Sequence, residues 1–445
     1  MLRYMRIVGI TLAFAATLGL SLSAAEHGEL SFQQTADRGV YVEKGYRGAP
    51  DSAGVLKQYT IRVPRFSVAV YYAAFQKHDP LGPQINSWPD GTNRIQPLPV
   101  HDFQNLKPGG MFLVAKLEDN QYLALLPLEG RATVAWFTSS PPDLTLNVGN
   151  LGSAPVQGDL PLIAWARSGD PYAAAGIAWQ MAIAHPLIGG STRLRSEKRY
   201  PEILRDLGWC SWEEYKGSIN EKILLDAIGA IEESGLPIRW VLVDDGHLKE
   251  KNRQLTGFDP NAKFPHGWAP ILERRRPDKI RWMGVWLNFN GYWNGISPEN
   301  ELGPIGEDLG PVPERNLPKN AGKALTALEP KPGMEHSFAF YDAMIGNARR
   351  AGFDFIKVDN QAKNLALYRG SAQPVESAIA NAKALEFAAA FHMDGLINCM
   401  AHGPVCVFNT RISAVTRCSE DYKVGDLARA RRHLHNSFGN MIWLG

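Results

Sequence analysis

The chain has 445 residues, of which 45% are hydrophobic, and its formal net charge is +2. This length exceeds one small core and suits two domains, one of which could be a barrel of about 250 residues. The near-neutral charge argues against nucleic acid as the main partner. Four cysteines are too few for a disulfide scaffold, although an exported chain could oxidise a pair: Cys210, Cys399, Cys406 and Cys418.

Residues 1–25 have the pattern of a secretory signal peptide. Arg3 and Arg6 precede an uncharged apolar run over residues 7–20, and the small residues before Glu26 suit cleavage. The alternative is a membrane anchor, but the run is short against the roughly 20 residues that a span needs. We therefore expect cleavage near Ala25 and a secreted or periplasmic protein without a membrane partner.

Residues 26–198 are predicted to form an N-terminal all-β sandwich domain. Short runs rich in β-branched and aromatic residues, such as residues 58–63 and 122–126, are separated by Gly, Pro, Asn and Asp. Runs of this kind with turn residues between them are typical of antiparallel strands in a sandwich.

Residues 199–445 change to a repeat of apolar strand, loop and amphipathic helix, which is the signature of parallel β/α units. The clearest helix is residues 219–233, whose apolar side chains fall on one face. The predicted strands are residues 207–212, 239–244, 281–288, 354–359, 395–400, 414–418 and 441–444. We predict an α/β catalytic domain, a (β/α)8 TIM barrel cut short near strand 7, in either a truncated product or a piece of a longer chain.

The segment from residue 290 to residue 336 is the longest irregular stretch, dense in Pro, Gly, Asn and Glu. Long loops inside compact domains are usually functional lids or disordered segments. Because this one follows the third predicted strand, it would lie over the mouth where barrel active sites form. We expect it to be a lid or a wall of the substrate site.

Two acids follow predicted buried strands, as the paired carboxylates of a retaining glycosidase would. Asp359 ends the fourth strand, and Lys357 two residues earlier points to the same side, where its charge would keep Asp359 ionised. Asp421 follows the sixth strand, with Arg417 four residues before it and Glu420 beside it to raise its pKa. The plainer alternatives are an ion pair between Lys357 and Asp359 and a helix start at Asp421.

Asp244 and Asp245 form a third acidic site after a strand, and Gly246 lets the chain turn so that both reach one pocket. A divalent metal is the competing interpretation, but the histidines are scattered, so we expect neither a metal nor a cofactor. Aromatic rings near the strand ends could stack on sugars or pack in the core: Trp209, Trp212, Trp286 and Trp293.

Five motifs in this order resemble glycoside hydrolase family 36 of clan D, the α-galactosidases and raffinose synthases, and the likeness is strongest to the raffinose synthase branch. They are GWCSW at 208–212, VDDG at 243–246, KVD at 357–359, INCMAH at 397–402 and RCSED at 417–421. The resemblance covers the chain from about residue 205 to its end. It implies a barrel behind an N-terminal β-sandwich, in agreement with the pattern of the elements.

The resemblance also implies roles for individual residues. Asp359 would be the nucleophile and Asp421 the acid/base. The other residues would bind the sugar: Asp244 and Asp245 at the 4- and 6-hydroxyls, Lys357 at the 3- and 4-hydroxyls, Arg417 toward the 2-hydroxyl, and Trp286, Cys399 and Trp209 as parts of the wall. The chain departs from the family at His247, where Trp is usual, and at Glu420, where Asp is usual. It also has no sequence for the rest of the barrel or for the family's C-terminal β-domain.

The leading hypothesis is an exported retaining α-galactosidase that hydrolyses raffinose-type oligosaccharides through a covalent galactosyl-enzyme. A galactosyltransferase would use the same intermediate with a sugar acceptor in place of water, although an export signal argues against biosynthetic donors. A third hypothesis is a carbohydrate-binding homologue that has lost turnover. Composition and spacing alone predict only a barrel with carboxylates at the strand ends, and the specificity for galactose rests on the resemblance.

Overall fold

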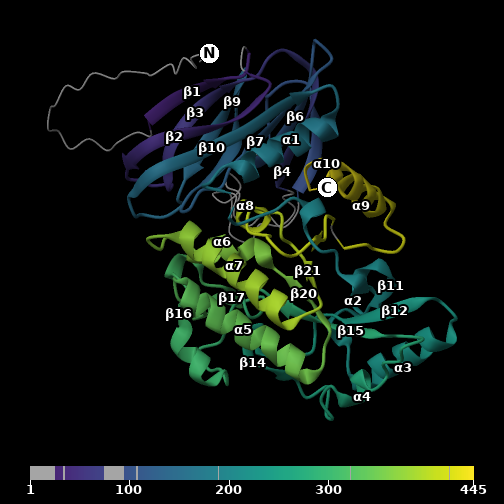
Figure 1. The fold of residues 1–445 in the computed structure, drawn as a ribbon. Helices are drawn as coiled ribbons and strands as arrows, with labels where there is room; N and C mark the ends of the chain where they lie inside the picture. Colours follow the sequence, from purple (N-terminus) through teal and green to yellow (C-terminus); the bar gives the residue numbers. More distant parts are fainter. Residues whose placement is uncertain are drawn as a thin grey trace, which may run out of the picture.

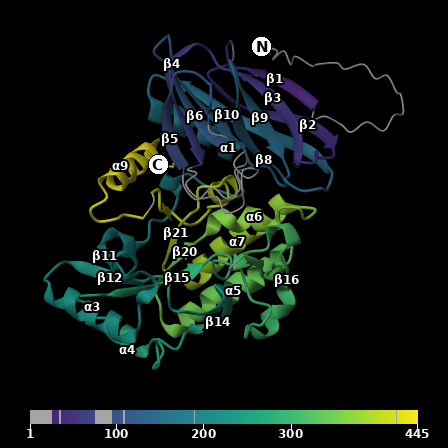
Figure 2. The ribbon, with the colours of Figure 1, turned by 180° about the vertical axis from the view of Figure 1, so that it is seen from behind.

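The structure is a computed structural model that describes residues 26–444 except 34–35, 75–94, 107–108, 189, 321 and 420. The predicted signal segment, with its cleavage site at Ala25, and Glu420 lie outside the described residues. Two sheets organise the described part, with the N-terminal sheet above the β/α part in Figure 1 and in the reverse view of Figure 2.

The first ten strands pair into one curled sheet in the described part, in the order β1-β3-β9-β8-β6-β7-β10-β2, with β4 paired to β6 and β5 paired to β4. The pairs are antiparallel except β1 with β3. The strands are β1 (Glu26–Ser31), β2 (Arg38–Gly48), β3 (Val55–Arg62), β4 (Phe66–Ala74), β5 (Ile95–Val100), β6 (Gly110–Leu117), β7 (Tyr122–Pro127), β8 (Val134–Ser140), β9 (Asp143–Gly149) and β10 (Val156–Ser168). The all-β N-terminal fold is confirmed.

Helix α1 (Pro171–Ala184) covers one face of this sheet and begins at Asp170, whose side chain accepts a hydrogen bond from the Ala173 N–H at 2.8 Å. Its buried side chains are all alanine: Ala174, Ala175, Ala178 and Ala182. Their small size lets the helix backbone lie close to the sheet, beside β7 and β10.

The second sheet has six parallel strands in chain order, β11-β12-β15-β20-β21-β22. They are β11 (Leu207–Cys210), β12 (Ile238–Val243), β15 (Trp282–Asn288), β20 (Phe355–Asp359), β21 (Gly395–Asn398) and β22 (Val415–Thr416). The helices between these strands are α2 (Trp212–Tyr215), α3 (Glu221–Glu233), α4 (Ala269–Leu272), α5 (Met334–Ala351), α6 (Asn364–Tyr368), α7 (Pro374–His392) and α8 (Pro404–Val407), and α9 (Leu427–Gly439) follows β22. This is an incomplete β/α barrel, and six predicted strands are confirmed with boundaries shifted by a few residues.

The seventh predicted strand, residues 441–444, is wrong because this segment is helix α10 (Met441–Leu444). Trp443 packs against the rings of Tyr72 and Phe112 of the N-terminal sheet, and its carbonyl accepts the Trp179 indole N–H at 2.7 Å. A four-residue apolar run has no period that separates strand from helix, so its packing partner decides.

The predicted lid segment is folded rather than irregular. It holds two short antiparallel pairs, β16 (Leu309–Pro311) with β19 (Leu328–Pro330) and β17 (Lys319–Asn320) with β18 (Lys323–Ala324). A further pair, β13 (Leu248–Lys251) with β14 (Gln254–Pro260), lies before it in the chain. An isolated bridge between Leu255 and Ile296 connects β14 to the predicted lid segment. A second bridge, between Asn288 and Gly291, holds the first residues of this segment near the end of β15.

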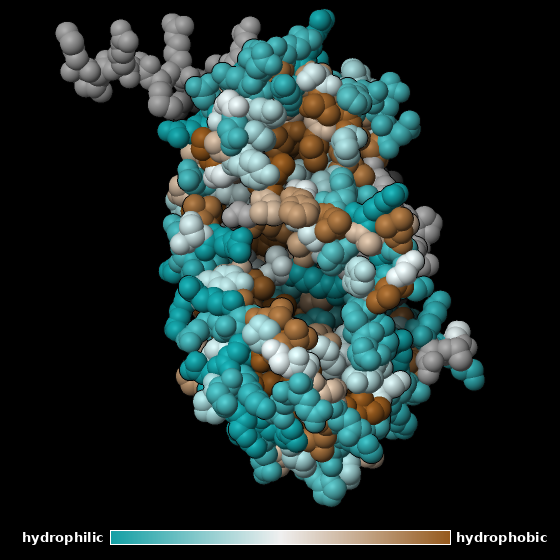
Figure 3. Space-filling model, turned by 90° about the vertical axis from the view of Figure 1, so that its right-hand side faces the viewer, coloured by the Kyte–Doolittle hydropathy of each residue, from teal (hydrophilic) through white to brown (hydrophobic). Residues whose placement is uncertain are grey.

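Helix α9 turns its apolar side outward. Asn436 is buried, whereas Leu427, Leu434, Phe438 and Met441 at the same end of the chain are all more than half exposed. Figure 3 looks at the side of the molecule that carries this helix and shows hydrophobic residues around a hollow between the upper and lower parts. Among the described helices, none is both long and apolar enough to cross a membrane.

Glu129 lies at the boundary between the two sheets and makes stability depend on pH. It is 5% exposed, and its carboxylate accepts a hydrogen bond from Asn409 at 2.7 Å. Burial raises the pKa of this carboxyl to about 8, against the lowering effects of Asn409 and Lys383. Between about pH 4.5 and 8 the folded chain therefore keeps a proton that the unfolded chain releases, so stability falls as pH rises.

We expect Glu129→Gln to flatten this fall, because an amide has no proton to release. Relative to the parent, the free energy of unfolding of the variant should rise by at most about 1.4 kcal/mol for each pH unit across this window. Urea unfolding at several pH values between 5 and 8 measures the slopes. Equal slopes for parent and variant would show that Glu129 titrates normally.

Candidate active site

Asp359 is held at the end of β20, the buried strand Phe355–Asp359. Its Oδ1 accepts the backbone N–H of Asn360 at 2.7 Å, and its Oδ2 accepts the indole N–H of Trp286 at 3.2 Å. Asn360 has φ of 64°, the left-handed conformation that asparagine tolerates, and this turns the chain sharply after the strand. The carboxylate is thus fixed by neighbours on β15 and on its own turn.

Lys357 forms a buried ion pair with Asp244, at 2.7 Å between Nζ and Oδ2. Burial opposes the charge on the ammonium, but Asp244 and further groups, Asp359 among them, raise the pKa of Lys357 above its ordinary value overall. The Cys210 thiol donates to Asp244 at 3.3 Å. The Lys357–Asp359 ion pair that the sequence allowed is replaced by Lys357–Asp244, which leaves Asp359 free of a direct ion pair with Lys357.

Asp245 points to a different set of partners. Its two oxygens accept the hydroxyl of Tyr292 and the indole N–H of Trp293, each at 2.7 Å. Burial raises the pKa of Asp245, and these two hydrogen bonds oppose the rise. Tyr292 was missed in the sequence, although its place directly before Trp293 and shortly after a predicted strand was a usable signal. The start of the predicted lid segment therefore contacts the acidic site.

Asp421 lies after β22 and is held by two side chains. Arg417 Nη2 donates to Oδ1 at 2.5 Å, and the indole N–H of Trp212 donates to Oδ2 at 3.2 Å. Burial disfavours the charge on Arg417, but Cys399 and Asp421 raise its pKa overall. The alternative of a helix start at Asp421 is wrong, since α9 begins at Leu427 with Asp426 as its cap.

Cys399 connects the two carboxylates. Arg417 Nη1 donates to its sulfur at 3.6 Å, while burial first and then Asp359 raise the pKa of the Cys399 thiol to about 12. The Cys399 thiol is therefore neutral and has Asp359 and Arg417 as neighbours. Arg417 also binds Asp421. These contacts and the tilted packing of Trp286 against Trp293, at 5.9 Å between centroids, bring the predicted residues together.

Trp209 is the predicted site residue that these contacts do not include, because its ring packs against Tyr215 with centroids 6.1 Å apart. His247 is buried: its Nε2 donates to the Trp286 carbonyl at 2.9 Å, and burial lowers its pKa to about 4. The neutral histidine thus binds the backbone of Trp286 and helps to hold this residue in place. The departure from the family at this position therefore affects packing under the site.

Within the described residues, no group of three or more His, Cys, Asp or Glu side chains is arranged to hold a metal ion. The polar side chains present are instead suited to a sugar, with carboxylates that accept from hydroxyls and cations that donate to them. Asp359 and Asp421 supply two carboxylates that differ in setting, since Asp359 is 7% exposed and the Asp421 side chain 33%.

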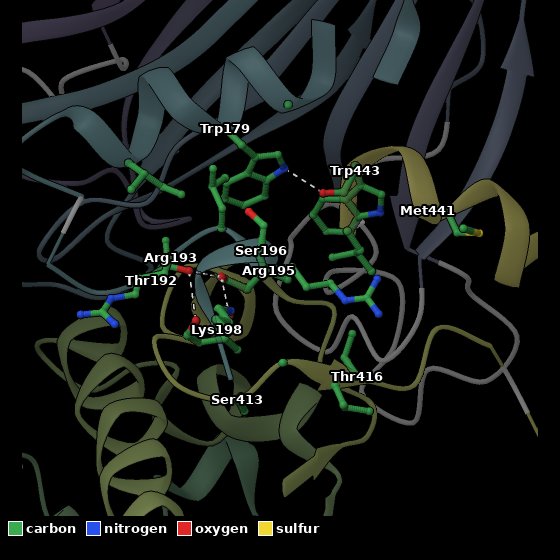
Figure 4. Close-up of a pocket in the computed structure, with 18 of the residues that line it drawn as sticks. Trp179, Thr192, Arg193, Arg195, Ser196, Lys198, Ser413, Thr416, Met441 and Trp443 are labelled. Carbon is green, nitrogen blue, oxygen red and sulfur yellow. Dashed lines mark hydrogen bonds between the residues drawn. The ribbon is translucent and has the colours of Figure 1, made fainter. Parts of the chain in front are cut away.

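A separate pocket of about 460 Å³ lies between α1, α10 and the loop before β22. Figure 4 shows Trp179, Trp443, Arg195 and Lys198 around it. Asn398 and Thr416 line this pocket, whereas the next residues along each strand, Cys399 and Arg417, belong to the carboxylate site. The lining of this pocket includes none of the residues predicted for the carboxylate site.

The sequence is similar to a known family. The profile of the family described as raffinose synthase or seed imbibition protein Sip1 matches residues 116–264 and 267–445. A probable galactinol-sucrose galactosyltransferase 6 from Arabidopsis thaliana is 26% identical over 284 residues, which cover 57% of this chain and 38% of that protein. A galactinol-sucrose galactosyltransferase from Oryza sativa is 24% identical over 54% of this chain and 34% of its own length. The chain spans less than two fifths of these relatives.

Solved structures show the same fold. An α-galactosidase from Thermus thermophilus in complex with stachyose superposes with a TM-score of 0.55 at 17% identity, over 91% of this chain and 84% of that one. A variant family 36 α-galactosidase from Geobacillus stearothermophilus, also with stachyose, has a TM-score of 0.52 at 12% identity, over 87% and 54% of the two chains. At this identity the likeness is one of architecture.

Proposed function

The chain belongs to the raffinose synthase or seed imbibition protein Sip1 family, and on that premise we propose that it is a retaining α-galactosidase that hydrolyses terminal α-galactosides. The observation that carries the proposal is the pair of carboxylates, Asp359 at the end of β20 and Asp421 in the loop after β22, with Arg417 bound to both Asp421 and Cys399. Support for galactose comes from the names of the relatives, and support for oligosaccharides from the two stachyose complexes.

In the first step, a carboxylate oxygen of Asp359 attacks the anomeric carbon while the bond to the leaving oxygen breaks. Asp421, in its protonated form, gives its proton to that oxygen, so the leaving group departs as an alcohol. Lys357, Asp244 and Asp245 offer partners to the galactosyl hydroxyls. The result is an ester between galactose and Asp359, with Asp421 now ionised beside Arg417.

In the second step, Asp421 accepts a proton from water, whose oxygen attacks the anomeric carbon and releases Asp359. The hydroxyl of a second sugar can replace water without any other change, which is the transferase alternative. The curated relatives favour that alternative, since the names of those given above describe galactosyl transfer to sucrose. The two functions therefore differ only in the acceptor.

Product analysis separates the two functions. Incubation with an aryl α-galactoside should release the phenol and free galactose in equal amounts, and added sucrose should leave this ratio near one. Galactose that falls well below phenol as sucrose rises, with a trisaccharide in its place, would establish transfer. Sugar-dependent thermal stabilisation without any phenol would instead support a binding protein.

We further propose that the protein acts outside the cytoplasm, on the basis of the N-terminal pattern alone. Expression of the full chain in a bacterial host, with mass measurement of the protein recovered from periplasm and medium, tests this. An N-terminus at Glu26 in those fractions supports export, and an intact N-terminus confined to the cytoplasm contradicts it.

A further inference from the structure

We propose that Trp212 is a positioning residue for the acid/base Asp421, and that it acts by joining the two edges of the parallel sheet. The inference rests on the proposed function, because it assigns Trp212 a part in the same reaction. Trp212 is the first residue of α2, directly after β11, and its indole N–H lies 3.2 Å from Oδ2 of Asp421. It touches the acid rather than the bond that is cleaved.

The topology explains why this contact matters. β11 and β22 are the two end strands of the six-stranded sheet. The loop after β22 carries Asp421, and β22 itself has two residues, Val415 and Thr416. Such a short edge strand fixes the loop after it weakly. The hydrogen bond from Trp212 ties this loop to the opposite end of the sheet.

The donors on Asp421 come from two directions. Arg417 Nη2 holds Oδ1 from the same loop, and Trp212 holds Oδ2 from across the sheet. With both oxygens held, the plane of the carboxyl group is defined, and loss of the Trp212 N–H would remove the donor on Oδ2. The Asp421 side chain is 33% exposed, so packing restrains it less than it would a buried side chain, and hydrogen bonds matter more for its orientation.

Trp212 is itself supported. The ammonium of Lys216 lies 5.1 Å from the centre of its ring, and Lys216 is paired with Glu213 at 2.5 Å. A cation over an indole face restrains the ring and makes its N–H a better donor. The short helix α2 therefore presents a fixed hydrogen-bond donor to Asp421.

A positioning role predicts a dependence on the leaving group. Proton donation speeds the cleavage of a sugar leaving group, which would otherwise depart as an alkoxide, but hardly affects a dinitrophenolate, which is stable without a proton. A badly placed Asp421 should slow galactosyl-enzyme formation from raffinose far more than from 2,4-dinitrophenyl α-galactoside. General loss of structure would slow both alike.

The experiment replaces Trp212 with β-(3-benzothienyl)alanine, which keeps the ring shape and lacks the N–H, and separately makes Trp212→Phe. We expect kcat/KM on raffinose to fall roughly 10- to 100-fold, the contribution of one hydrogen bond to a charged group. On the dinitrophenyl substrate we expect a change within about threefold. Trp165→Phe is the matched control, because it removes an indole bond to the Ala36 carbonyl in the N-terminal sheet.

The outcomes separate this inference from the proposed function. Asp421→Ala should show the same split between substrates, enlarged to roughly 10²- to 10⁴-fold. If Asp421→Ala shows the split and the benzothienyl variant slows both substrates equally or neither, only the role of Trp212 is wrong. If the parent cleaves neither substrate, or Asp421→Ala shows no split, the proposed function fails and this inference with it.

Discussion

Asp359→Asn should lower kcat/KM on an aryl α-galactoside by roughly 10⁴-fold or more, the loss seen when a nucleophile is removed. The amide keeps the size of the side chain and one oxygen, which can accept from either the Trp286 or the Asn360 N–H group. It cannot form the ester with galactose. The fold should therefore survive while the first chemical step is lost, which circular dichroism and initial rates measure together.

A fluorinated galactosyl donor, which slows the second step, gives a direct test of the nucleophile. The peptide that contains Asp359 should gain the mass of one fluorinated galactosyl group in the parent and none in Asp359→Asn. Asp394→Asn serves as the control, since that side chain is 57% exposed and pairs with Arg349 away from the site. Labelling of another acid, or full activity in Asp359→Asn, would overturn the mechanism.

Lys357→Met should destabilise the protein by about 3–5 kcal/mol, because it leaves the buried Asp244 carboxylate without its positively charged partner. The side chains of the pair are 9% and 2% exposed, so water cannot take the place of the ammonium. Activity should fall as well, since the site loses a cation that faces the sugar. Urea unfolding gives the free energy, and initial rates on the soluble fraction give the activity.

The double variant Lys357→Met with Asp244→Asn distinguishes the two effects. Removal of the second charge should recover most of the lost stability, because no buried charge is then unpaired. Activity should stay low, since neither charge is restored. A double variant no more stable than Lys357→Met would mean that the ion pair is not the source of the loss.

The candidate site was largely predictable from local sequence. Asp244 and Asp359 come at the ends of apolar strands, Asp421 lies in the loop after the short strand β22, and the ends of parallel strands meet at one edge of a sheet. The partner of Lys357 was not predictable. A spacing of two residues favoured Asp359, but the register of β12, β15 and β20 brings Asp244 within 2.7 Å.

The hydrogen-bond partners of two aromatic residues, Trp212 and Tyr292, were likewise not predictable from local sequence. The sequence placed Trp212 near a strand end as a ring that could stack on a sugar or pack in the core, and Tyr292 was not singled out, yet each donates to a site carboxylate. Their partners lie more than 40 residues away in the chain. No local period or motif carries such a pairing, because it depends on how separate loops meet.

The change from an all-β part to a β/α part and the positions of Asp244 and Asp359 after strands were predictable from local sequence, since hydrophobic periods of two and 3.6 residues are local properties. The helix at residues 441–444 depends instead on long-range contacts, because Trp443 packs on Tyr72 and Phe112. The pairing of each donor with its carboxylate also depends on such contacts. A short apolar run and a buried charge each have several partners of similar energy, and long-range packing selects among them.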